Sequence, residues 1–441
     1  MNTSRRAFLK TAALGAAVPF ILPSRIWAAD TKPSGKLTMG FIGMGKQSRG
    51  LLGNFLGQDT HVVAVCDVDT TRRENAKQVV DKTYAKSSAG GKGCAAYNDF
   101  RELIARKDID AVCIATPDHW HAIVTLAALR SGKDVYCEKP LTHNIHEAIE
   151  VMKAVDANKR VLQTGSMQRS MQEFRVACEL VRNGAIGKLE RVECQFGDPG
   201  KPCDLPEEKM GPGLDWNMWV GPAPMRPYNS VLSPRGMHNH FPNWRGYREF
   251  GGGMVTDWGA HHLDIAQWGL GTDDSGPVEV RPPADAAAKR GAMLVYANGV
   301  TVTHMEGFGV HFFGTEGEVM VNRGKFGFKR GSETIADSSD KALGSTEAQV
   351  SKAQKTYLKD AKVKLYVSHS HQLDFLDAVK ARTKPVTSEQ VGGHSAICCH
   401  LMNQAYYNHA TLKWDPAKFE FVGGTGNPAW LTRDYRSPWT V

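Results

Sequence analysis

The stretch Asp134-Val-Tyr-Cys-Glu-Lys-Pro140 is a short apolar strand that runs directly into a polar turn. A similar unit stands far upstream, where Leu37–Ile42 leads into the glycine turn Gly43-Met44-Gly45. Helical stretches alternate with further strands rich in Val and Ile, at His61–Cys66, Ala111–Ala115 and Val161–Thr164. Strand, helix and strand in succession predict right-handed crossovers and a parallel sheet covered on both faces. Residues 36–165 are therefore expected to form a doubly wound α/β (Rossmann) sheet.

After residue 165 the pattern changes to hairpins and isolated helices. Met293–Ala297 and Val300–Met305 read as strands, and Asn298-Gly299 between them is a strong hairpin signal. Helices are expected over His371–Val379 and Val391–Tyr406. These features predict a C-terminal α+β domain with a mostly antiparallel sheet over residues 166–420, followed by a tail over 421–441.

Residues 330–364 are rich in lysine and serine and show little apolar periodicity, so we predict a solvated insertion there. The nine cysteines include no C-x-x-C pair. A disulfide stays open for five of them, which are Cys94, Cys178, Cys203, Cys398 and Cys399.

Length and charge point to an ordinary two-domain globular protein. The chain has 441 residues, of which 41% are hydrophobic and 23% charged. Its formal charge of +8 comes partly from residues 1–29, which hold four of the 54 Lys and Arg residues and no Asp or Glu. The rest carries 50 basic against 46 acidic residues, which is too small an excess to argue for nucleic-acid binding.

The N-terminus reads as an export signal. Ser4-Arg5-Arg6-Ala7-Phe8-Leu9-Lys10 precedes an apolar run, Thr11–Leu22, that is too short to span a bilayer as a permanent helix. The twin arginines followed by Phe8 and Leu9 resemble a Tat signal peptide. We expect residues 1–29 to be that signal, with a periplasmic or exported mature protein that keeps no stable membrane anchor.

Four motifs in a fixed order carry a family resemblance. They are Gly43-x-Gly45 after a strand, Thr116-Pro117-x-x-x-His121, Glu138-Lys139-Pro140 and Asp257-Trp258-Gly259-Ala260-His261. Together, and over residues 36–420, they resemble the Gfo/Idh/MocA family of sugar and cyclitol dehydrogenases. The resemblance implies a nicotinamide cofactor bound by the N-terminal domain and a carbohydrate substrate held between the two domains.

The glycine turn is the candidate phosphate-binding element. Gly43, Met44 and Gly45 allow close backbone approach to a pyrophosphate, with N–H groups of the following helix free to bind it. Asp67 ends the second strand, 24 residues after Gly43, where a carboxylate accepts hydrogen bonds from the adenosine ribose. That carboxylate would repel a 2′-phosphate and favours NAD. The neighbouring Arg72 and Arg73 keep NADP open as the less favoured cofactor.

Lys139 is the first catalytic candidate, because ligands of parallel sheets bind at the carboxyl ends of the strands. The resemblance adds Asp257 and His261 as its catalytic partners and Thr116, Pro117, His121, Glu138 and Lys139 as cofactor-binding residues. Neutral His261 can then take the proton of a hydroxyl group, Asp257 can fix its tautomer and Lys139 can stabilise alkoxide charge.

Gln168, Arg169 and His262 are the candidate substrate-binding residues. Many aromatic side chains lie between Trp216 and Trp268 and suit either a sugar pocket or a core. The histidine pairs His238/His240 and His261/His262 lack a carboxylate or cysteine ligand at a metal-site spacing, so no metal is expected.

The sequence thus favours a nicotinamide oxidoreductase that acts on a secondary hydroxyl group of a sugar, glycoside or cyclitol, as a homo-oligomer. Export away from the cytoplasmic nicotinamide pool favours a tightly held NAD. Two alternatives stay open. One is a redox-neutral NAD-dependent glycosidase that oxidises, eliminates, hydrates and reduces. The other is a non-catalytic sugar-binding protein.

Overall fold

The first sheet is a six-stranded parallel sheet, as the sequence predicts. A computed structural model describes residues 35–86 and 93–441, so the predicted export signal lies outside the described residues. The strand order is β3-β2-β1-β4-β5-β6 and every pair is parallel. The strands are β1 (Leu37–Ile42), β2 (Thr60–Cys66), β3 (Ala95–Tyr97), β4 (Ala111–Ile114), β5 (Asp134–Cys137) and β6 (Leu162–Thr164). The reversal of order beside β1 places a ligand-binding crevice at the ends of β1 and β4.

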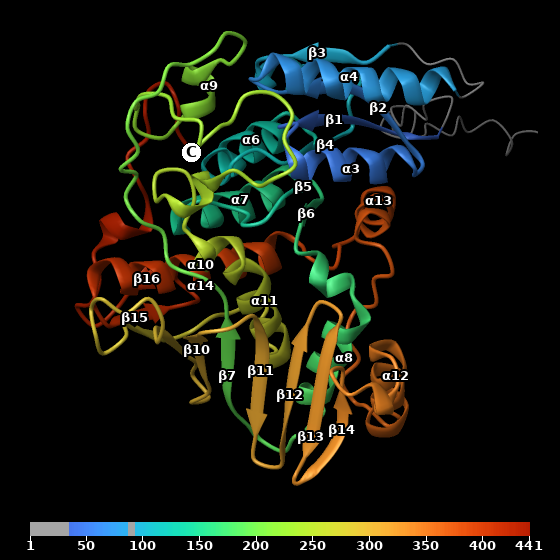
Figure 1. The fold of residues 1–441 in the computed structure, drawn as a ribbon, viewed down its shortest axis with the longest axis vertical. Helices are drawn as coiled ribbons and strands as arrows, with labels where there is room; N and C mark the ends of the chain where they lie inside the picture. Colours follow the sequence, from blue (N-terminus) through green and yellow to red (C-terminus); the bar gives the residue numbers. More distant parts are fainter. Residues whose placement is uncertain (1–34, 87–92) are drawn as a thin grey trace, which may run out of the picture. The chain divides into compact units, whose positions relative to one another are not determined.

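Helices cover both faces of this sheet (Figure 1). They are α3 (Lys46–Leu56), α4 (Thr70–Ala85), α5 (Phe100–Ile104), α6 (Asp118–Arg130) and α7 (Ile145–Asn158). Leu51, Leu52 and Phe55 of α3 are 4% exposed or less, because they form the apolar stripe that packs on the strands. Val112 and Val135 of the central strands are fully buried, which explains why these strands read as continuous apolar runs.

The second sheet has ten strands in the order β14-β13-β12-β11-β7-β10-β9-β8-β15-β16 (Figure 1). All its neighbours are antiparallel except β7 and β10, which run parallel. Its strands are β7 (Leu189–Gln195), β8 (Glu279–Arg281), β9 (Met293–Val295), β10 (Thr301–Met305), β11 (Gly309–Gly314), β12 (Gly317–Asn322), β13 (Lys325–Arg330), β14 (Glu333–Asp337), β15 (Leu412–Asp415) and β16 (Glu420–Phe421). The expected C-terminal α+β fold is confirmed.

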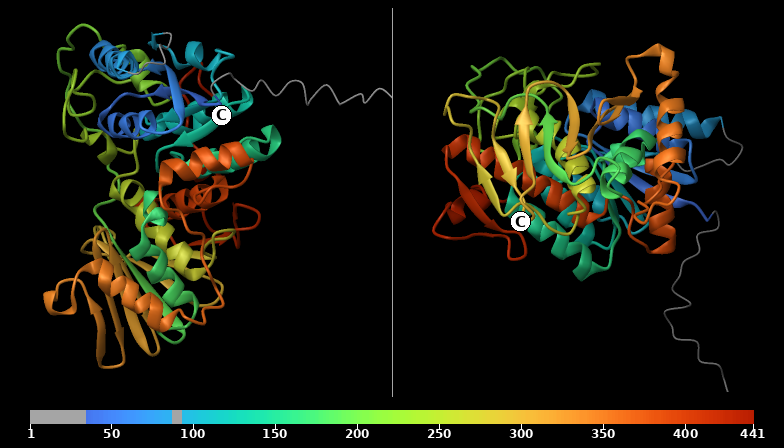
Figure 2. Two further views of the ribbon diagram at one scale, coloured as in Figure 1. Left: turned by 90° about the vertical axis from the view of Figure 1, so that its right-hand side faces the viewer. Right: turned by 90° about the horizontal axis from the view of Figure 1, so that it is seen from below.

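Three helices pack between this sheet and the rest of the chain, namely α8 (Gln172–Arg182), α11 (Gly259–Leu270) and α14 (Glu389–Asn408). Figure 2 shows the sheet with helices against one of its faces. Phe312 and Val192 of the sheet and Leu263 of α11 share one buried cluster. This packing fixes α11, which carries His261, against the sheet.

The prediction of a solvated insertion over residues 330–364 is wrong. These residues form β14 and α12 (Thr346–Tyr357) instead of a solvated insertion, and Val350 and Ala353 of α12 are buried in the core. Gln349 of α12 accepts a hydrogen bond from the backbone of Asp337, which ties the helix to β14. Hydrophobic periodicity does not reveal a helix with few apolar residues, because a narrow apolar stripe is enough to pack such a helix against the core.

The nine cysteines are all free thiols, so the disulfide left open above does not form in this structure. Eight are buried, and Cys203 is half-buried. Buried thiols such as Cys178 and Cys398 behave as small apolar side chains of the core.

Two C-terminal segments pack on the first sheet. Phe375 of α13 (His371–Ala381) lies 6.2 Å from Phe55 and 5.9 Å from Tyr136, ring centroid to centroid. Trp439 lies 4.7 Å from Trp120 in the same way. The chain therefore returns from the second sheet to complete the core around the first.

Among the described residues, no helix combines the length and the apolar character needed to cross a membrane.

Candidate active site

The glycine turn lies at the crevice between β1 and β4. Gly43 has φ +83°, and a Cβ atom there would come within 2.8 Å of the Ala115 carbonyl oxygen, so only glycine fits without strain. A Cβ on Gly45 would meet nothing within 4 Å, because Gly45 faces an open cleft of about 880 Å³ at the start of α3. Gly43, Gly45, Asp67, Thr116 and Pro117 all line this cleft. A dinucleotide phosphate fits a site with free helix N–H groups and no side chain in its way.

Asp67 lies at the end of β2 with its carboxylate against the glycine turn. One oxygen accepts a hydrogen bond from the Met44 N–H at 2.6 Å and the other from the Asp69 N–H at 2.8 Å. Each oxygen keeps a second lone pair for a ligand hydroxyl group. Burial raises the pKa of Asp67, and the nearby Arg72 guanidinium opposes that rise. Met44 thus acts through its backbone, while its side chain is fully buried.

The residues after β4 and β5 are tied together by His121. Its ring nitrogens lie 2.9 Å from the Thr116 carbonyl oxygen and 2.7 Å from the Pro140 carbonyl oxygen. Burial lowers the pKa of His121 to about 4, so the ring is neutral and donates one proton to one of the two oxygens. This geometry makes His121 a brace between the cleft and the Lys139 turn. The hydroxyl group of Thr116 is buried and has no partner among the described residues.

Glu138 connects the cleft to the Lys139 turn. Gln47, which lines the cleft, donates a hydrogen bond to the Glu138 carboxylate at 2.9 Å. A Cβ atom on Gly165 would come within 2.8 Å of that carboxylate, so a larger residue there would displace the Glu138 side chain. Burial raises the pKa of Glu138.

Lys139 and Asp257 form the centre of the candidate catalytic group. The Lys139 ammonium donates to the Asp257 carbonyl oxygen at 2.7 Å and forms an ion pair with its carboxylate. Each side chain is only 15% exposed. Burial opposes ionisation of Asp257, but Lys139 and Arg245 outweigh it and hold the pKa of Asp257 below its usual value. The Asp257 carboxylate therefore stays charged in the interior.

His261 completes the group but does not contact Asp257 as expected. The helical stretch is interrupted at Trp258, so Asp257 ends α10 (Met254–Asp257) and His261 lies in α11. The ring accepts at Nε2 from the Arg323 guanidinium at 3.1 Å, and Nδ1 has no partner among the described residues. Burial, with Lys139 and Arg323 nearby, lowers the pKa of His261 well below its usual value. The tautomer role given to Asp257 is thereby corrected.

Arg245 and Arg323 are site residues that the sequence analysis missed. Arg245 Nε lies 3.5 Å from Asp257 Oδ2, and its guanidinium stacks over Trp244 at 4.2 Å. It comes from a loop with no periodicity, so only its aromatic neighbours marked it in the sequence. Arg323 follows β12 and is brought to His261 by the hairpin alone. Because Arg245 lines the cleft and pairs with Asp257, it joins the cleft to the candidate catalytic group.

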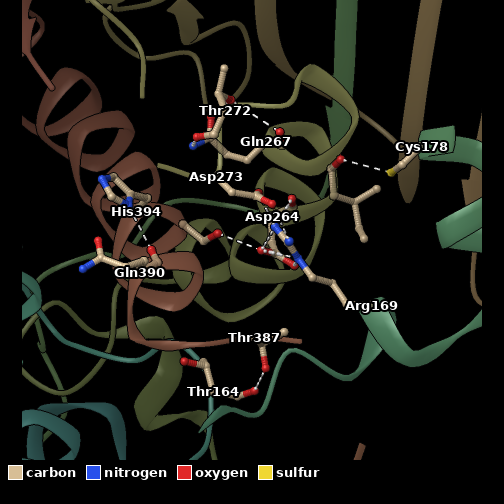
Figure 3. Close-up of polar contacts among 12 residues, drawn as sticks. Thr164, Arg169, Cys178, Asp264, Gln267, Thr272, Asp273, Thr387, Gln390 and His394 are labelled. Carbon is tan, nitrogen blue, oxygen red and sulfur yellow. Dashed lines mark hydrogen bonds and ion pairs between the residues drawn. The ribbon is translucent and has the colours of Figure 1, made fainter. Parts of the chain in front are cut away.

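The three predicted substrate residues have different environments. His262 is fully buried and lies 2.9 Å through Nδ1 from the Gln195 carbonyl oxygen, while its Nε2 lacks a partner among the described residues. Gln168 is also fully buried, and neither atom of its amide group has a partner there. Arg169 is 2% exposed and its guanidinium forms ion pairs with Asp264 and Asp273 (Figure 3). Arg169 is thus committed to the interior and is not free to bind a substrate.

A long loop lines part of the same cleft as the glycine turn. Residues 196–253, here called the covering loop, connect β7 to α10 and include α9 (Trp216–Val220) and η2 (Asn243–Gly246). Phe241, Trp244 and Arg245 of this loop line the cleft. Most other aromatic side chains of the segment form the loop's own core, since Trp219, Tyr228, Tyr247 and Phe250 are 7% exposed or less.

The covering loop is fastened to the end of the first sheet. Arg235 forms an ion pair with the fully buried Asp69, which also accepts from the Gly236 N–H at 3.1 Å. Arg72 donates to the carbonyl oxygens of Pro234 and Gly236. Figure 1 shows the yellow-green loop crossing beside α3 and α6.

His238 and His240 lie in the covering loop, apart from the pair in α11. His238 Nδ1 is 2.9 Å from the His240 carbonyl oxygen and its Nε2 is 3.3 Å from Arg72. Among the described residues, no group of three or more His, Cys, Asp or Glu side chains is arranged to hold a metal ion.

Two family models match the chain. The model of the oxidoreductase family's NAD-binding Rossmann fold matches residues 37–166, and that of its C-terminal alpha/beta domain matches residues 185–441. The chain belongs to the Gfo/Idh/MocA oxidoreductase family. The cleft at Gly43 and Gly45 lies in the NAD-binding part of this family, and Asp257 and His261 lie in its C-terminal part.

Relatives within the family are similar over part of their length. Inositol 2-dehydrogenase 3 of Saccharopolyspora erythraea is 34% identical over 155 residues, which cover 35% of this chain and 46% of the relative. A glycosyl hydrolase family 109 protein of Shewanella pealeana is 29% identical over 216 residues, covering 44% of this chain and 46% of the relative. The chain thus aligns with less than half the length of each of these proteins.

A solved structure of levoglucosan dehydrogenase in complex with NADH and levoglucosan is similar over nearly its whole length. The TM-score is 0.56 at 19% identity, and the match covers 86% of this chain and 99% of that protein. At this identity the likeness shows the shared fold.

Proposed function

We propose that this protein oxidises a secondary hydroxyl group of a sugar, glycoside or cyclitol with a tightly held NAD. The observation that carries the proposal is the Lys139–Asp257 ion pair beside neutral His261, joined to the glycine-turn cleft through Arg245. When bound, the nicotinamide supplies the acceptor for a hydride. The residues of the chain do the rest of the chemistry.

His261 is the proposed proton acceptor. Its pKa lies well below the usual value, so the ring is neutral at neutral pH and has a lone pair for the hydroxyl proton. The O–H bond breaks toward His261 as the C–H bond breaks and the carbonyl group forms. Lys139 stabilises the negative charge that develops on the substrate oxygen. Asp257 holds Lys139 through an ion pair in which each side chain is only 15% exposed, and Arg245 pairs with the same carboxylate.

The choice of NAD over NADP rests on Asp67 and Arg72. The Asp67 carboxylate lines the cleft where a 2′-phosphate would bring more negative charge. Arg72, a cation that lines the same cleft, already donates to two carbonyl oxygens of the covering loop and is 7% exposed. Neutralising a 2′-phosphate would require these contacts to break.

Tight retention of the cofactor is supported by the covering loop. The loop lines the same cleft as the glycine turn, so a dinucleotide bound there would be enclosed from both sides. This arrangement agrees with the export that we propose from Ser4–Lys10, because an exported enzyme has no nicotinamide pool from which to exchange its cofactor. The names of the inositol and levoglucosan dehydrogenases among its relatives support a polyol ring as substrate.

The decisive experiment is native purification of the mature protein followed by mass spectrometry of released nucleotide. We expect about one NAD per chain and little NADP. Incubation with inositols, sugars and glycosides should then yield an oxidised product and bound NADH in equal amounts. Recovery of protein that is free of nucleotide and binds NAD weakly would contradict the proposal that the cofactor is tightly held. Release of an aglycone without net NADH would replace the dehydrogenase with the redox-neutral glycosidase.

The export proposal needs its own measurement, which is fractionation of cells that express the full chain. The mature protein should be found outside the cytoplasm. Replacing Arg5 and Arg6 together by lysine should keep it inside, because the charge is retained and the twin-arginine signal is lost.

A further inference from the structure

Arg323 has an unusual partner for a guanidinium group. Its side chain is exposed, its terminal nitrogen lies 3.1 Å from His261 Nε2, and its guanidinium carbon lies 4.8 Å from the centre of the Trp258 ring. The other two cations of the site, Lys139 and Arg245, share the Asp257 carboxylate. Across the described residues, no carboxylate lies within ion-pair distance of Arg323. One positive charge at the catalytic group therefore has only a neutral imidazole as its polar side-chain partner.

The position of Arg323 conflicts with the chemistry proposed for His261. The Nε2 lone pair that Arg323 occupies is the only polar contact of this ring, and Nδ1 is buried without a partner among the described residues. A substrate hydroxyl group can give its proton to Nε2 only after Arg323 moves away. A neutral hydroxyl group competes weakly for a guanidinium, whereas a carboxylate binds it through two parallel charge-assisted hydrogen bonds.

We propose that Arg323 binds a carboxylate of the substrate, so that the site selects sugar acids and carboxylate binding frees His261 for proton transfer. This inference rests on the proposed oxidation of a polyol ring. Arg323 acts in it as a specificity-determining residue that also controls access to the base. The substrate class is a sugar acid, such as a uronate.

A carboxylate fits this position better than a phosphate group. One guanidinium without an acidic partner balances a single negative charge, while a phosphate monoester carries nearly two at neutral pH. The Arg323 guanidinium lies over the Trp258 ring, and a planar carboxylate would pair with the edge of that guanidinium in place of His261. Phe308, 44% exposed and 4.3 Å from Trp258 between ring centroids, extends the apolar surface on which a sugar ring can lie.

The test uses the purified holoenzyme and pairs of sugars that differ only at the sixth carbon. The probes are D-glucuronate against D-glucose and D-galacturonate against D-galactose, with D-glucose 6-phosphate as a third anion. Calorimetry gives the dissociation constants, and absorbance of bound NADH gives turnover. We expect a uronate to bind at least ~10-fold tighter than its neutral partner, as one charge-assisted bidentate pair would produce.

Three variants separate charge recognition from a loss of folding. Arg323→Ala should weaken uronate binding by at least ~10-fold and change binding of the neutral sugar less than ~2-fold. Arg323→Lys should keep part of the preference for uronates, because lysine supplies the positive charge but not the two parallel N–H donors of a guanidinium. Lys325→Ala, which removes an exposed cation two residues away, should behave as wild type. The acid limb of the turnover profile should also move to higher pH in Arg323→Ala, because a cation that opposes protonation of His261 is gone.

Several results would overturn the inference. An equal loss of acidic and neutral sugar binding in Arg323→Ala would reduce Arg323 to a general contact. If D-glucose 6-phosphate binds most tightly, the ligand group of Arg323 is a phosphate and not a carboxylate. If no uronate binds more tightly than its neutral partner, the inference is wrong. Oxidation of neutral sugars without acid preference would leave the proposed function standing. Selective binding of uronates without formation of NADH would instead support the carboxylate site and contradict the proposed oxidation.

Discussion

Lys139 makes two contacts with one residue, because its ammonium donates both to the carbonyl oxygen and to the carboxylate of Asp257. The ion pair is largely buried, so it depends on good geometry and on the second cation, Arg245. Removing Lys139 leaves a charged carboxylate facing Arg245 and takes one cation away from His261. Both effects are measurable without unfolding the protein.

We predict that Lys139→Met lowers turnover by at least ~10²-fold, the low end for a lost catalytic group of this kind. Bound NAD should remain, since the cleft is lined by other residues. Lys139 lowers the pKa of His261 in the wild type, so its loss should move the acid limb of kcat/KM to higher pH. Steady-state kinetics over pH measure both effects, with the exposed Lys188→Ala as control. A variant with wild-type turnover would refute the proposed site.

At the scale of elements, the covering loop lines the same cleft as the glycine turn. Its attachment uses few but strong contacts, above all the ion pair of Arg235 with the buried Asp69. Asp69 also begins α4 by accepting from the N–H groups of Thr71 and Arg72, so one carboxylate serves both the helix and the loop. Detaching the loop therefore need not unfold α4.

We predict that Arg235→Ala speeds release of NAD by about 10-fold or more, the effect of losing a charge-assisted hydrogen bond of about 1.5–3 kcal/mol. Dissociation is followed by trapping released NAD with an NAD-consuming enzyme. The matched control is Arg281→Ala, which breaks an exposed pair with Glu279 on β8. Equal release rates in both variants would show that the loop does not retain the cofactor.

At the scale of the whole molecule, Arg169 joins three elements of different origin. It follows β6 of the first sheet, pairs with Asp264 of α11, and reaches α14 through Ser395, which donates to the same carboxylate at 2.9 Å. Figure 3 shows the guanidinium between Asp264 and Asp273. The Arg169–Asp264 pair is only 1–2% exposed, and losing either partner leaves the other buried without its ion pair.

We predict that Arg169→Met lowers the free energy of unfolding by about 3–5 kcal/mol, because Asp264 is left buried without its ion-pair partner. Urea denaturation followed by fluorescence measures this change, and circular dichroism checks the native fold. The exposed Arg281→Ala should stay within about 0.5 kcal/mol of wild type. Unchanged stability with a selective loss of substrate affinity would return Arg169 to the substrate site.

The sequence by itself determined the fold class and predicted that Gly43, Gly45 and Asp67 lie at one cleft. Gly43 and Asp67 act within one strand–helix–strand unit, so their order in the chain fixes their places in space. Alternating apolar strands and helices gave the first sheet, apart from the short β3. The hairpin at Asn298-Gly299 was equally local, and β9 and β10 confirm it. Such patterns act over a few residues and therefore survive without tertiary information.

The tertiary structure alone decided which charges meet. Arg323 and His261 are 62 residues apart, and Lys139 and Asp257 are 118 apart. The sequence could rank Lys139, Asp257 and His261 as candidates through a family resemblance, but not the missing Asp257–His261 contact or the place of Arg323. The sequence also could not reveal that the Arg169 guanidinium forms ion pairs with Asp264 and Asp273. Long-range ion pairs produce no periodic pattern in the sequence. They depend on where whole helices and strands pack and on how much water that packing excludes.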